Sequence, residues 1–548
     1  MATGMTTDQL NLVPLTIILP VLYAEIHYRF KYFFSLLNKK EPEIIADIPS
    51  RCLAGGKLPV LITIKDAHRY PVTIRKVEIF TRDISSAVFE INQSINTKFY
   101  DRIFELPTDS WKTGVQYLSI EITYMVDRKT KKCLNDNYRF TSHKALPVTI
   151  SRTPLPRLAG CIYGDPHTHS NYTSDQVEFG ASLTATSRLA KCLELDFFCV
   201  TDHSYDLDDH PDDYLQNDLD LTKWNALLKE TENLNRSSDK FFIIAGEEVT
   251  LRNNLDKNIH CLVLNNKKFY PGSGDSGERW FRTRSELSLP DLLNDTQIEN
   301  LLIFAAHPAE KPPFLQRLLI GRDHWRIADC THSGLNGLQF LNGGSSDSLK
   351  TGKKFWRSLL LKGYRLTGLS GNDSHGSFAR SRQIRMPFIS MREDYYHLFG
   401  NWRTGVYIDT GNNHYDQCLQ NIRNGNCFMT NGPAMQFTSG ECAMGGIVDR
   451  LDTLSLEALS SPEFGALSSI HIYHGEYKTG TEQCIYIKKI STEVFHYHET
   501  IKPPANGPGY VRCEVYTSTG HQALSNPIWI NNQKSGVRNQ KSGNRIDV

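Results

Sequence analysis

The sequence predicts an α/β protein in which a barrel of strands and helices is flanked by a β-sandwich before it and a small β domain after it. Three changes of pattern along the chain predict this organisation. From about residue 41 to residue 150, short β-rich segments are separated by turns, which is typical of a β-sandwich. From residue 156 onward, apolar strands alternate with helical segments, which favours a parallel sheet closed into a barrel. After residue 434 the short strands return.

The boundaries of the expected parts follow from these changes. We expect an apolar segment at 1–40, the β-sandwich at 41–155, the barrel at 156–434, the C-terminal β domain at 435–530 and a polar, disordered tail at 531–548. Strands of the sandwich are expected at 58–65, 72–80, 116–126 and 145–150. In the barrel, helical segments are expected at 181–195 and 221–234, and a last helix and strand at 417–433.

The composition is that of a folded protein and argues against some classes of partner. Basic and acidic residues number 61 and 60, so the formal charge of +1 provides no field that would draw the chain to nucleic acid. The 12 cysteines are scattered and form no CxxC pair, which indicates free thiols in a reducing compartment rather than a zinc ribbon. We therefore expect a cytoplasmic protein that does not bind nucleic acid.

The N-terminal segment is strongly apolar. Residues 10–24 (LNLVPLTIILPVLYA) are fewer than the ~20 needed to cross a bilayer, and they include Pro14 and Pro20. No basic residue precedes them, unlike in a secretory signal. A buried edge of the first domain, a shallow membrane contact through residues 10–35 and an atypical span all remain open.

Imidazole and carboxylate side chains recur near the ends of the inferred barrel strands. They are His167, His169, Asp175, Asp202, His203, Glu248, His260, His307, Asp373 and His375. Barrel enzymes build their active sites at the C-terminal edge of the strands. Neutral imidazole and carboxylate together are the ligands of Zn²⁺, Mn²⁺ or Fe²⁺ sites that hold a reactive water. The repeated placement, rather than any single residue, predicts a metal cluster.

The chain contains a second HxH motif, with which the one at 167–169 can be compared. His496 and His498 form the same motif in the C-terminal β domain, where nothing else matches it, and we interpret them as part of a solvated strand face. His471 and His474 receive the same interpretation.

Taken in order, the central motifs resemble one known family. They are HxH at 167–169, TDH at 201–203, G-x-E at 246–248, a strand-borne His260, AHP at 306–308 and GNDSH at 371–375. This set resembles the PHP (polymerase and histidinol phosphatase) superfamily over about residues 158–433. TNGP at 430–433 and the following β domain are similar to its CehA/McbA-like branch of metallohydrolases. The resemblance implies a distorted, TIM-like (β/α)7 barrel.

The resemblance also implies two or three divalent ions (Zn, Mn or Fe). One ion would take His167, His169, Glu248 and Asp373; a second would share Glu248 and add His260 and His307; a third would take Asp175, His203 and His375. The loop from His169 to Asp175 is one residue longer than the family pattern, which leaves the third ion open. The G-x-E spacing selects Glu248, with Glu247 on the other face of its strand.

Other residues are candidates for catalysis and substrate binding. We expect His203 or His375 to transfer a proton to the leaving group. Asp202 is expected beside His203, either fixing an imidazole or capping a helix. Arg252 and Arg380 are the candidates for binding an anionic group of the substrate. The inserts at 265–300 and 311–334 are expected to shape the mouth of the pocket.

The pattern therefore predicts a metal-dependent hydrolase that uses a metal-bridging hydroxide on a small-molecule substrate, either phosphorylated or acyl. The arginines favour a phosphoesterase. A carbamate, amide or ester hydrolase is the alternative that the TNGP branch favours, and an inactive binding scaffold is a third hypothesis. The oligomeric state is left open.

Overall fold

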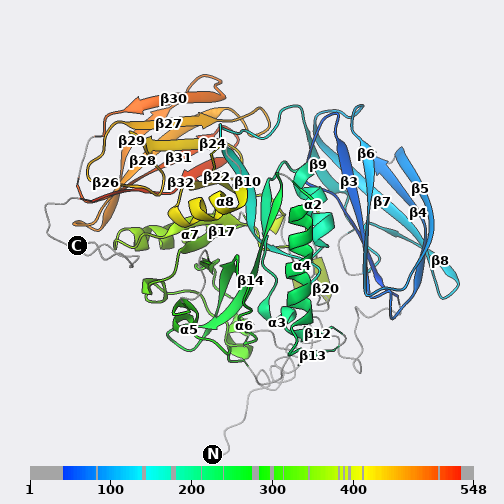
Figure 1. Ribbon diagram of the computed structural model, residues 1–548. Coiled ribbons are helices and arrows are strands. Elements are labelled where there is room, and N and C mark those ends of the chain that lie inside the picture. Colours follow the sequence, from blue (N-terminus) through cyan, green and yellow to red (C-terminus); the bar gives the residue numbers. More distant parts are fainter. Residues whose placement is uncertain are drawn as a thin grey trace, which may run out of the picture.

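The computed structural model of the 548-residue chain consists of three parts that follow one another along the sequence, with the central part between two β-rich parts (Figure 1). The structure describes residues 41–81, 84–138, 143–173, 180–211, 213–238, 240–274, 283–295, 301–312, 314–343, 346–380, 383–386, 389–392, 397–409, 413–503 and 507–531. The predicted apolar segment at 1–40, its membrane contact through 10–35 and the tail from 532 onward lie outside these residues. Within the described ranges, no helix is long and apolar enough to cross a bilayer.

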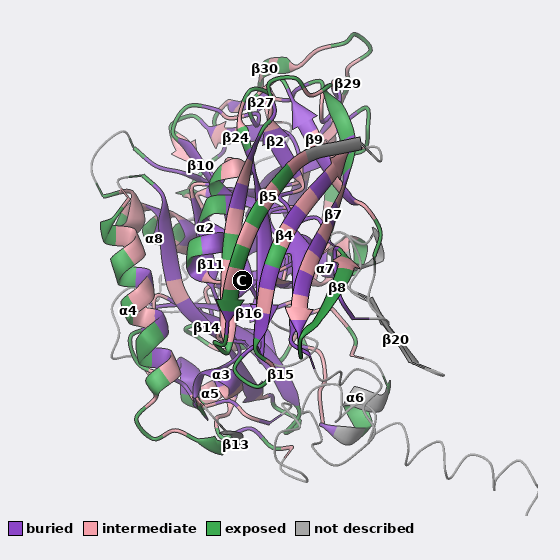
Figure 2. Cartoon of the chain, turned by 90° about the vertical axis from the view of Figure 1, so that its right-hand side faces the viewer, coloured by how far each residue is buried: buried purple, intermediate pink, exposed green. Residues whose placement is uncertain are grey.

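Residues 43–151 form two sheets that share one core. The first sheet contains β1 (Glu43–Asp47), β3 (Lys57–Lys65) and β6 (Phe99–Pro107). The second contains β2 (Arg51–Leu53), β9 (Leu146–Ser151), β7 (Gly114–Val126), β4 (Val72–Thr81) and β5 (Ile84–Ile95), with β8 (Lys129–Leu134) beside β7. Alternate residues of β4 and β7 are buried, as the banding in Figure 2 shows, because successive side chains of a strand point to opposite faces. The buried set includes Ile62 of the first sheet and Val77 and Ile120 of the second.

The central part is built around β10 (Cys161–His169), in which every residue is buried. β11 (Phe197–Val200) runs parallel to β10, and β14 (Phe242–Arg252) runs parallel to β11. β15 (Asn258–Leu264) is antiparallel to both β14 and β16 (Leu302–Ala306). β17 (Gly337–Asn342) and β18 (Thr367–Gly371) continue in parallel from β16. The short β19 (Ser374–His375) then pairs in parallel with β10, so the chain after β18 returns to the strand on which this part began.

The central part contains four longer helices and several short ones among the described residues. The longer ones are α2 (Leu183–Cys192), α4 (Thr222–Arg236), α7 (Ser346–Leu360) and α8 (His414–Asn424). The short ones are α3 (Ser204–Leu207), α5 (Leu289–Leu293), α6 (Phe314–Leu319) and the 3₁₀ helix η1 (Asp329–Thr331). Ser182 begins α2 as an N-cap, since its side chain accepts a hydrogen bond from the backbone N–H of Ala185.

The predicted TIM-like (β/α)7 barrel is wrong. Of the residues that the structure describes, 46% lie in strands and 15% in helices, and the sheets are mixed rather than parallel. β14 and β15 are antiparallel neighbours with no helix between them, and the sheet continues from β10 through β22 (Arg403–Tyr407) and β23 (Cys427–Thr430) into the C-terminal strands. A short, fully buried apolar run has the same pattern in a parallel and an antiparallel strand, so the sequence could not distinguish the two.

The C-terminal part extends this sheet and adds a second one. The extension runs from β23 through β32 (Gln522–Ser525), β31 (Gly509–Thr517), β28 (Leu467–Glu476) and β29 (Thr481–Lys489), with β33 (Ile528–Ile530) and β26 (Ile447–Val448) at its side. The second sheet contains β25 (Cys442–Ala443), β24 (Ala434–Ser439), β27 (Leu454–Leu459) and β30 (His496–Ile501). Two further hairpins pair β12 (Asp209–His210) with β13 (Asp213–Asn217) and β20 (Gln383–Met386) with β21 (Ile389–Arg392).

A buried network of charges joins α7 to the C-terminal sheet. Nη2 of Arg512 donates to Oε2 of Glu482 at 2.7 Å, and Arg512 also pairs with Glu514; all three side chains are 1–2% exposed. Nζ of Lys353, on α7, donates to Oε2 of Glu514 at 3.0 Å. Burial opposes ionisation of Glu514, but the charges of Arg512 and Lys353 outweigh it and lower the pKa of Glu514 to about 2.

Replacing Arg512 with Met should lower the free energy of unfolding by about 3–5 kcal/mol, because Glu482 and Glu514 would stay buried without the guanidinium. Lys132→Met is the matched control, since Lys132 forms a mostly exposed ion pair with Glu121 and its loss should change the free energy by less than about 1 kcal/mol. Chemical denaturation at pH 7 measures both values. Equal losses in the two variants would contradict the expected role of the network.

Candidate metal centre

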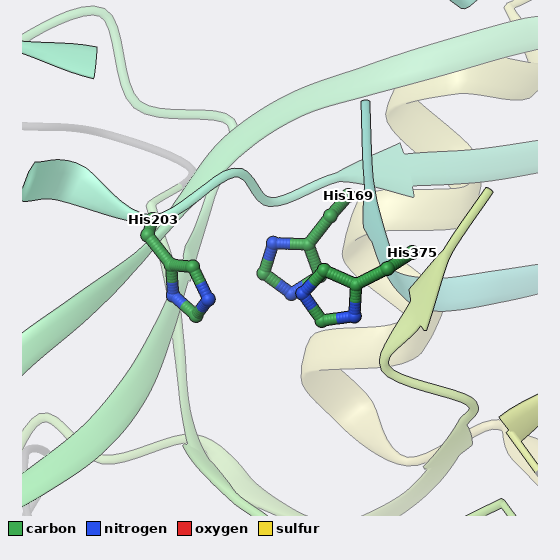
Figure 3. Close-up of side chains that lie close together, drawn as sticks. All are labelled: His169, His203 and His375. Carbon is green, nitrogen blue, oxygen red and sulfur yellow. The ribbon is translucent and has the colours of Figure 1, made fainter. Parts of the chain in front are cut away.

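The end of β10 supplies two of the predicted ligands. His167 and His169 are buried and two residues apart, so their rings lie on the same side of the strand. The pairing of β10 with β19 sets Thr168 beside Ser374 and His169 beside His375. The rings of His169 and His375 consequently stack, with centroids 4.1 Å apart, and His203 faces them (Figure 3).

Glu248 reaches the same place from β14. The antiparallel register pairs Glu248 with Leu262 and Thr250 with His260, so Glu248 and His260 lie on one face of the β14–β15 ladder. Nδ1 of His260 is 2.8 Å from Oε1 of Glu248. His203, just after β11, forms a β-bridge with Glu248 and places Nδ1 3.2 Å from Oε2.

Four potential ligand atoms surround one point near the ends of β10 and β18 and the middle of β14. Nε2 of His167 lies 3.4 Å from Oε2 of Glu248 and 3.3 Å from Oδ1 of Asp373. Nε2 of His169 lies 3.5 Å and 3.1 Å from the same two oxygens. The two Nε2 atoms are 3.3 Å apart. Tetrahedral ligands about 2.1 Å from one ion would be roughly 3.4 Å from each other, so these contacts match a tetrahedral metal site.

Further ligand groups flank this one. His203, Glu248 and His260 bring ligand atoms within 4.8 Å of one another, and so do His169, His203 and His375. Nε2 of His307 lies 3.0 Å from Oε1 of Glu248. The structure therefore brings together His167, His169, His203, Glu248, His260, His307, Asp373 and His375. Asp175, the remaining predicted ligand, lies outside the described residues.

The surroundings of Oε2 of Glu248 suit an oxygen that binds a cation. It is buried and lies 3.2–3.5 Å from nitrogens of His167, His169 and His203, yet it has no hydrogen-bond partner of acceptable geometry among the described residues. A buried carboxylate oxygen in that situation is strongly unfavourable unless a positive charge compensates it. The donor set and its geometry thus suit a divalent ion.

Charges within the cluster keep both carboxylates ionised. Burial opposes the charged form of Glu248, but the charges of His260 and His167 outweigh it and hold the pKa of Glu248 well below its usual range. The pKa of Asp373 is also lowered, because His167 and His169 outweigh burial. Conversely, the charges of Asp373 and Glu248 overcome burial and raise the pKa of His167 to about 9. The centre holds negative charge that protons or metal ions must balance.

Two ligands occupy strained backbone conformations. The φ angles of His307 and Asp373 are 30° and 51°, in the left-handed region that residues other than glycine seldom adopt. The backbone N–H of Asp373 donates to the carbonyl of His167 at 2.9 Å, and that of His307 donates to Oε1 of Gln339 at 3.1 Å. Such conformations cost of order 1–3 kcal/mol each and cluster at functional sites. Here they direct two side chains toward the same point.

Asp202 supports the centre in a way that differs from both expected roles. Its Oδ1 accepts hydrogen bonds from the backbone N–H groups of Ser170 (2.7 Å) and Thr173 (2.9 Å), and its Oδ2 accepts one from Oγ of Ser170 (2.6 Å). These contacts are with the loop after His169 rather than with a ring or the first turn of α3. Asp202 therefore fixes the exit of the chain from β10.

Two neighbours of the ligands have supporting contacts. Glu247 lies on the opposite face from Glu248, where it accepts hydrogen bonds from Nδ2 of Asn266 (2.6 Å) and the backbone N–H of Tyr270 (2.9 Å). Oε1 of Gln339 lies 3.2 Å from Nδ1 of His167, which leaves Nε2 of that ring for the cluster. The sequence analysis did not single out Gln339, because a glutamine inside an apolar strand has no motif of its own.

A cavity of about 160 Å³ opens beside the cluster. Its lining includes two predicted ligands, His260 and His307, together with Glu310, Lys311, Arg322, Asp323, His324 and Trp325. Nη2 of Arg322 is 3.2 Å from Nδ1 of His260, and Nε1 of Trp325 donates to the carbonyl of His260 at 2.8 Å. The insert at 311–334 therefore forms one wall of the cavity. Its run of charged and aromatic residues, RDHWR at 322–326, is the feature of the sequence that could have identified Arg322 as a residue of the site.

The two arginines expected to bind substrate lie elsewhere. Nη1 of Arg252 donates to Oδ1 of Asp256 at 3.2 Å. Nε of Arg380 is 3.8 Å from Oδ2 of Asp47, in the N-terminal sandwich. Neither arginine lines the cavity beside the cluster, whereas Arg322 does. His203 and His375, the expected proton-transfer residues, both belong to ligand groups.

Comparison with known proteins adds no functional information. No family model and no curated protein matches the chain. Among solved structures, it is similar to trypsin-activated α2-macroglobulin from Escherichia coli (8% identity, TM-score 0.17, 90% of this chain and 24% of that one). It is also similar to β-D-mannosidase from Dictyoglomus thermophilum (7% identity, TM-score 0.24, 90% of this chain and 67% of that one). A third similarity is to β-glucuronidase from Parabacteroides merdae (9% identity, TM-score 0.19, 89% of this chain and 65% of that one). These similarities are too weak to indicate a shared fold, and the chain spans only about a quarter of the macroglobulin.

His169→Ala should reduce the metal content of the purified protein by at least one ion, because His169 belongs to two ligand groups. His498→Ala is the matched control, since it alters the exposed HxH of β30 and should leave the metal content unchanged. Elemental analysis per mole of protein measures both, with circular dichroism to verify that each variant is folded. Equal metal content in folded His169→Ala and wild-type protein would contradict the assignment.

Proposed function

We propose that this protein is a metal-dependent hydrolase that acts as a phosphoesterase on a small substrate. The observation that carries the proposal is the set of contacts among His167, His169, Glu248 and Asp373, whose spacing suits one tetrahedral ion, with further imidazoles around it. The ordered motifs that resemble the PHP superfamily support the same proposal. A site of this kind needs no serine or cysteine nucleophile.

Divalent ions held by these ligands would activate water and neutralise the negative charge that develops on the substrate. The chain's own residues supply the rest. Gln339 and Asp202 fix the positions of His167 and of the loop after His169. Oδ1 of Asp323 lies 2.8 Å from Nδ1 of His324 on the cavity wall, which orients that ring and leaves its Nε2 as the atom that exchanges a proton.

The guanidinium of Arg322 on the cavity wall supports a phosphorylated substrate. The cavity lining contains two cationic side chains, Lys311 and Arg322, and two acidic ones, Glu310 and Asp323. Nη2 of Arg322 lies 3.2 Å from Nδ1 of the predicted ligand His260. A guanidinium group binds phosphate oxygens through charge-assisted hydrogen bonds. Arg322 thus takes the role that the sequence analysis gave to Arg252 and Arg380.

A carbamate, amide or ester hydrolase is the second candidate, and the motif TNGP was its main support. In the structure this motif forms a turn at the end of β23. Oγ1 of Thr430 donates to the carbonyl of Pro433 at 2.6 Å, and the backbone N–H of Asn431 donates to the carbonyl of Gln522 at 3.2 Å. These contacts explain the motif as a connection to the C-terminal sheet. The third hypothesis, an inactive scaffold, does not account for why eight potential ligands converge.

Arg322→Met should lower kcat/KM for an aryl phosphate by roughly 10- to 100-fold, since a charged hydrogen bond contributes about 1.5–3 kcal/mol. Arg284→Met is the matched control, because Arg284 is exposed and pairs with Asp256 away from the cavity. Steady-state assays in Mn²⁺ or Zn²⁺, run in parallel with an aryl carbamate and an aryl ester, measure the effect. Turnover of the carbamate or ester but not of the phosphate would replace the first candidate with the second.

Removing divalent ions with a chelator should lower the melting temperature, because Glu248 and Asp373 would remain buried without their compensating charge. Ions bound at concentrations about 1,000 times their Kd would account for roughly 4 kcal/mol of stability. Scanning calorimetry before and after dialysis, and again after Mn²⁺ or Zn²⁺ is restored, measures the change. An unchanged melting temperature in protein shown to be metal-free would count against a structural contribution of the ions.

A further inference from the structure

Two apolar side chains of α6 project into solvent. Phe314 and Leu318 are 74% and 66% exposed, which places them among the most exposed large apolar residues of the described chain. They are four residues apart, so they lie on one face of the helix, and the exposed Arg317 lies beside them. Exposed apolar groups are unfavourable in water, and a surface that gathers them commonly marks a contact with a protein or a membrane.

The turn between β14 and β15, residues 253–257, extends this face. Leu255 in the turn is 53% exposed. Asn258, the first residue of β15, connects the turn to the chain that follows α6. Its backbone N–H donates to the carbonyl of Gly321 at 3.0 Å, and its Nδ2 donates to the carbonyl of Ile320 at 2.8 Å. The turn and α6 therefore lie at one end of the molecule, as Figure 2 shows for β15 and α6.

Cationic side chains accompany these apolar residues. Three of them are exposed and form no ion pair within the part of the chain that the structure describes: Lys257, Lys311 and Arg317. Of the neighbouring acidic residues, Glu310 lines the cavity beside the metal cluster, and Asp256 is paired with Arg252 and Arg284. Apolar side chains that can enter a bilayer, next to unpaired cations, suit a surface of anionic lipid.

The segment that precedes the described chain has a matching composition. Residues 10–24 are apolar, and residues 28–34 (YRFKYFF) combine aromatic with basic side chains, as is typical of segments at a membrane interface. Residues 25–40 join the apolar run to Glu41, where the described chain begins, and a chain of this length can span up to roughly 50 Å. One shallow contact binds a bilayer weakly, whereas two contacts on one chain reinforce each other. A lipid surface therefore explains both features, which a protein partner for α6 alone does not.

We propose that α6 and the turn at 253–257 dock the protein onto the surface of an anionic lipid bilayer. The apolar side chains enter the headgroup region, and the cations contact lipid phosphates. α6 lies between Pro312 and Arg322, which both line the cavity beside the metal cluster, so docking brings this cavity next to the headgroups. The substrate is then a phosphoester carried on a lipid. This last step rests on the proposed phosphoesterase function, whereas the docking surface does not.

Sedimentation of the full-length protein with vesicles tests the docking surface. We expect binding to phosphatidylcholine vesicles that contain about one quarter phosphatidylglycerol, and weaker binding in high salt or to phosphatidylcholine alone. The double variant Phe314→Ser/Leu318→Ser should bind at least about 10-fold more weakly, because two apolar side chains no longer leave water. Ile487→Ser is the matched control and should bind like the wild type. Ile487 is 55% exposed on β29, at the opposite end of the molecule from α6 (Figures 1 and 2).

Hydrogen exchange of the wild-type protein locates the contact. We expect exchange in residues 253–257 and 314–319 to slow when the vesicles are added. Equal vesicle binding by the folded double variant and the wild type would overturn the docking surface. So would a wild-type dimer, measured by light scattering, that the double variant converts to a monomer while vesicle binding stays the same, because the face would then belong to a contact between two copies of the chain.

Turnover separates the substrate from the docking surface. In Mn²⁺ or Zn²⁺, the double variant should hydrolyse a soluble aryl phosphate with the kcat/KM of the wild type, but phosphatidic acid in vesicles at least about 10-fold more slowly. Hydrolysis of the aryl phosphate but not of phosphatidic acid by vesicle-bound wild type would overturn the lipid substrate and leave the proposed function intact. Hydrolysis of neither, with vesicle binding as expected, would overturn the proposed function together with the substrate and leave the docking surface.

Discussion

The carboxylate of Glu248 is the group on which the rest of the candidate site depends. It is buried, it stays ionised, and nitrogens of His167, His169, His203, His260 and His307 lie around its two oxygens. An isolated charge at such a position would be very unfavourable. In the protein alone, positive charge on the surrounding imidazole rings compensates the negative charge of Glu248. Metal ions between these rings and the carboxylates of Glu248 and Asp373 would compensate it more fully. The position of each ligand-bearing element can be explained by this requirement.

The mixed sheet places ligands around Glu248 without a regular barrel. β10 and β19 set His169 beside His375 through parallel pairing, while the antiparallel ladder of β14 and β15 sets His260 on the face of Glu248. His307 and Asp373 add strained backbone at the ends of β16 and β18. The flanking β parts hold these strands from both sides. Asp47 of the sandwich accepts hydrogen bonds from the backbone N–H groups of residues 378–380, just after His375, and Arg512 joins the C-terminal sheet to α7 through shared carboxylates.

The sequence predicted which side chains lie close together better than it predicted the architecture, for a physical reason. Each of these side chains lies in a buried strand or within a few residues of its end, so its type and spacing could be recognised whether the strand is parallel or antiparallel. Strand direction depends instead on long-range pairing, and the antiparallel β15 between β14 and β16 left no local signal. The role of Asp202 and the position of Arg322 also depend on loops that fold back from distant parts of the chain. By contrast, Arg252 and Arg380 were chosen for their closeness in sequence to Glu248 and His375. Arg252 pairs instead with Asp256 in the turn after β14, and Arg380 lies beside Asp47 of the sandwich.

The most direct test of the central claim is anomalous X-ray diffraction from crystals of the protein grown with Zn²⁺ or Mn²⁺. The account predicts an anomalous peak about 2.1 Å from Nε2 of His167, Nε2 of His169, Oε2 of Glu248 and Oδ1 of Asp373. Metal-replete crystals with no anomalous peak among these four atoms would contradict it.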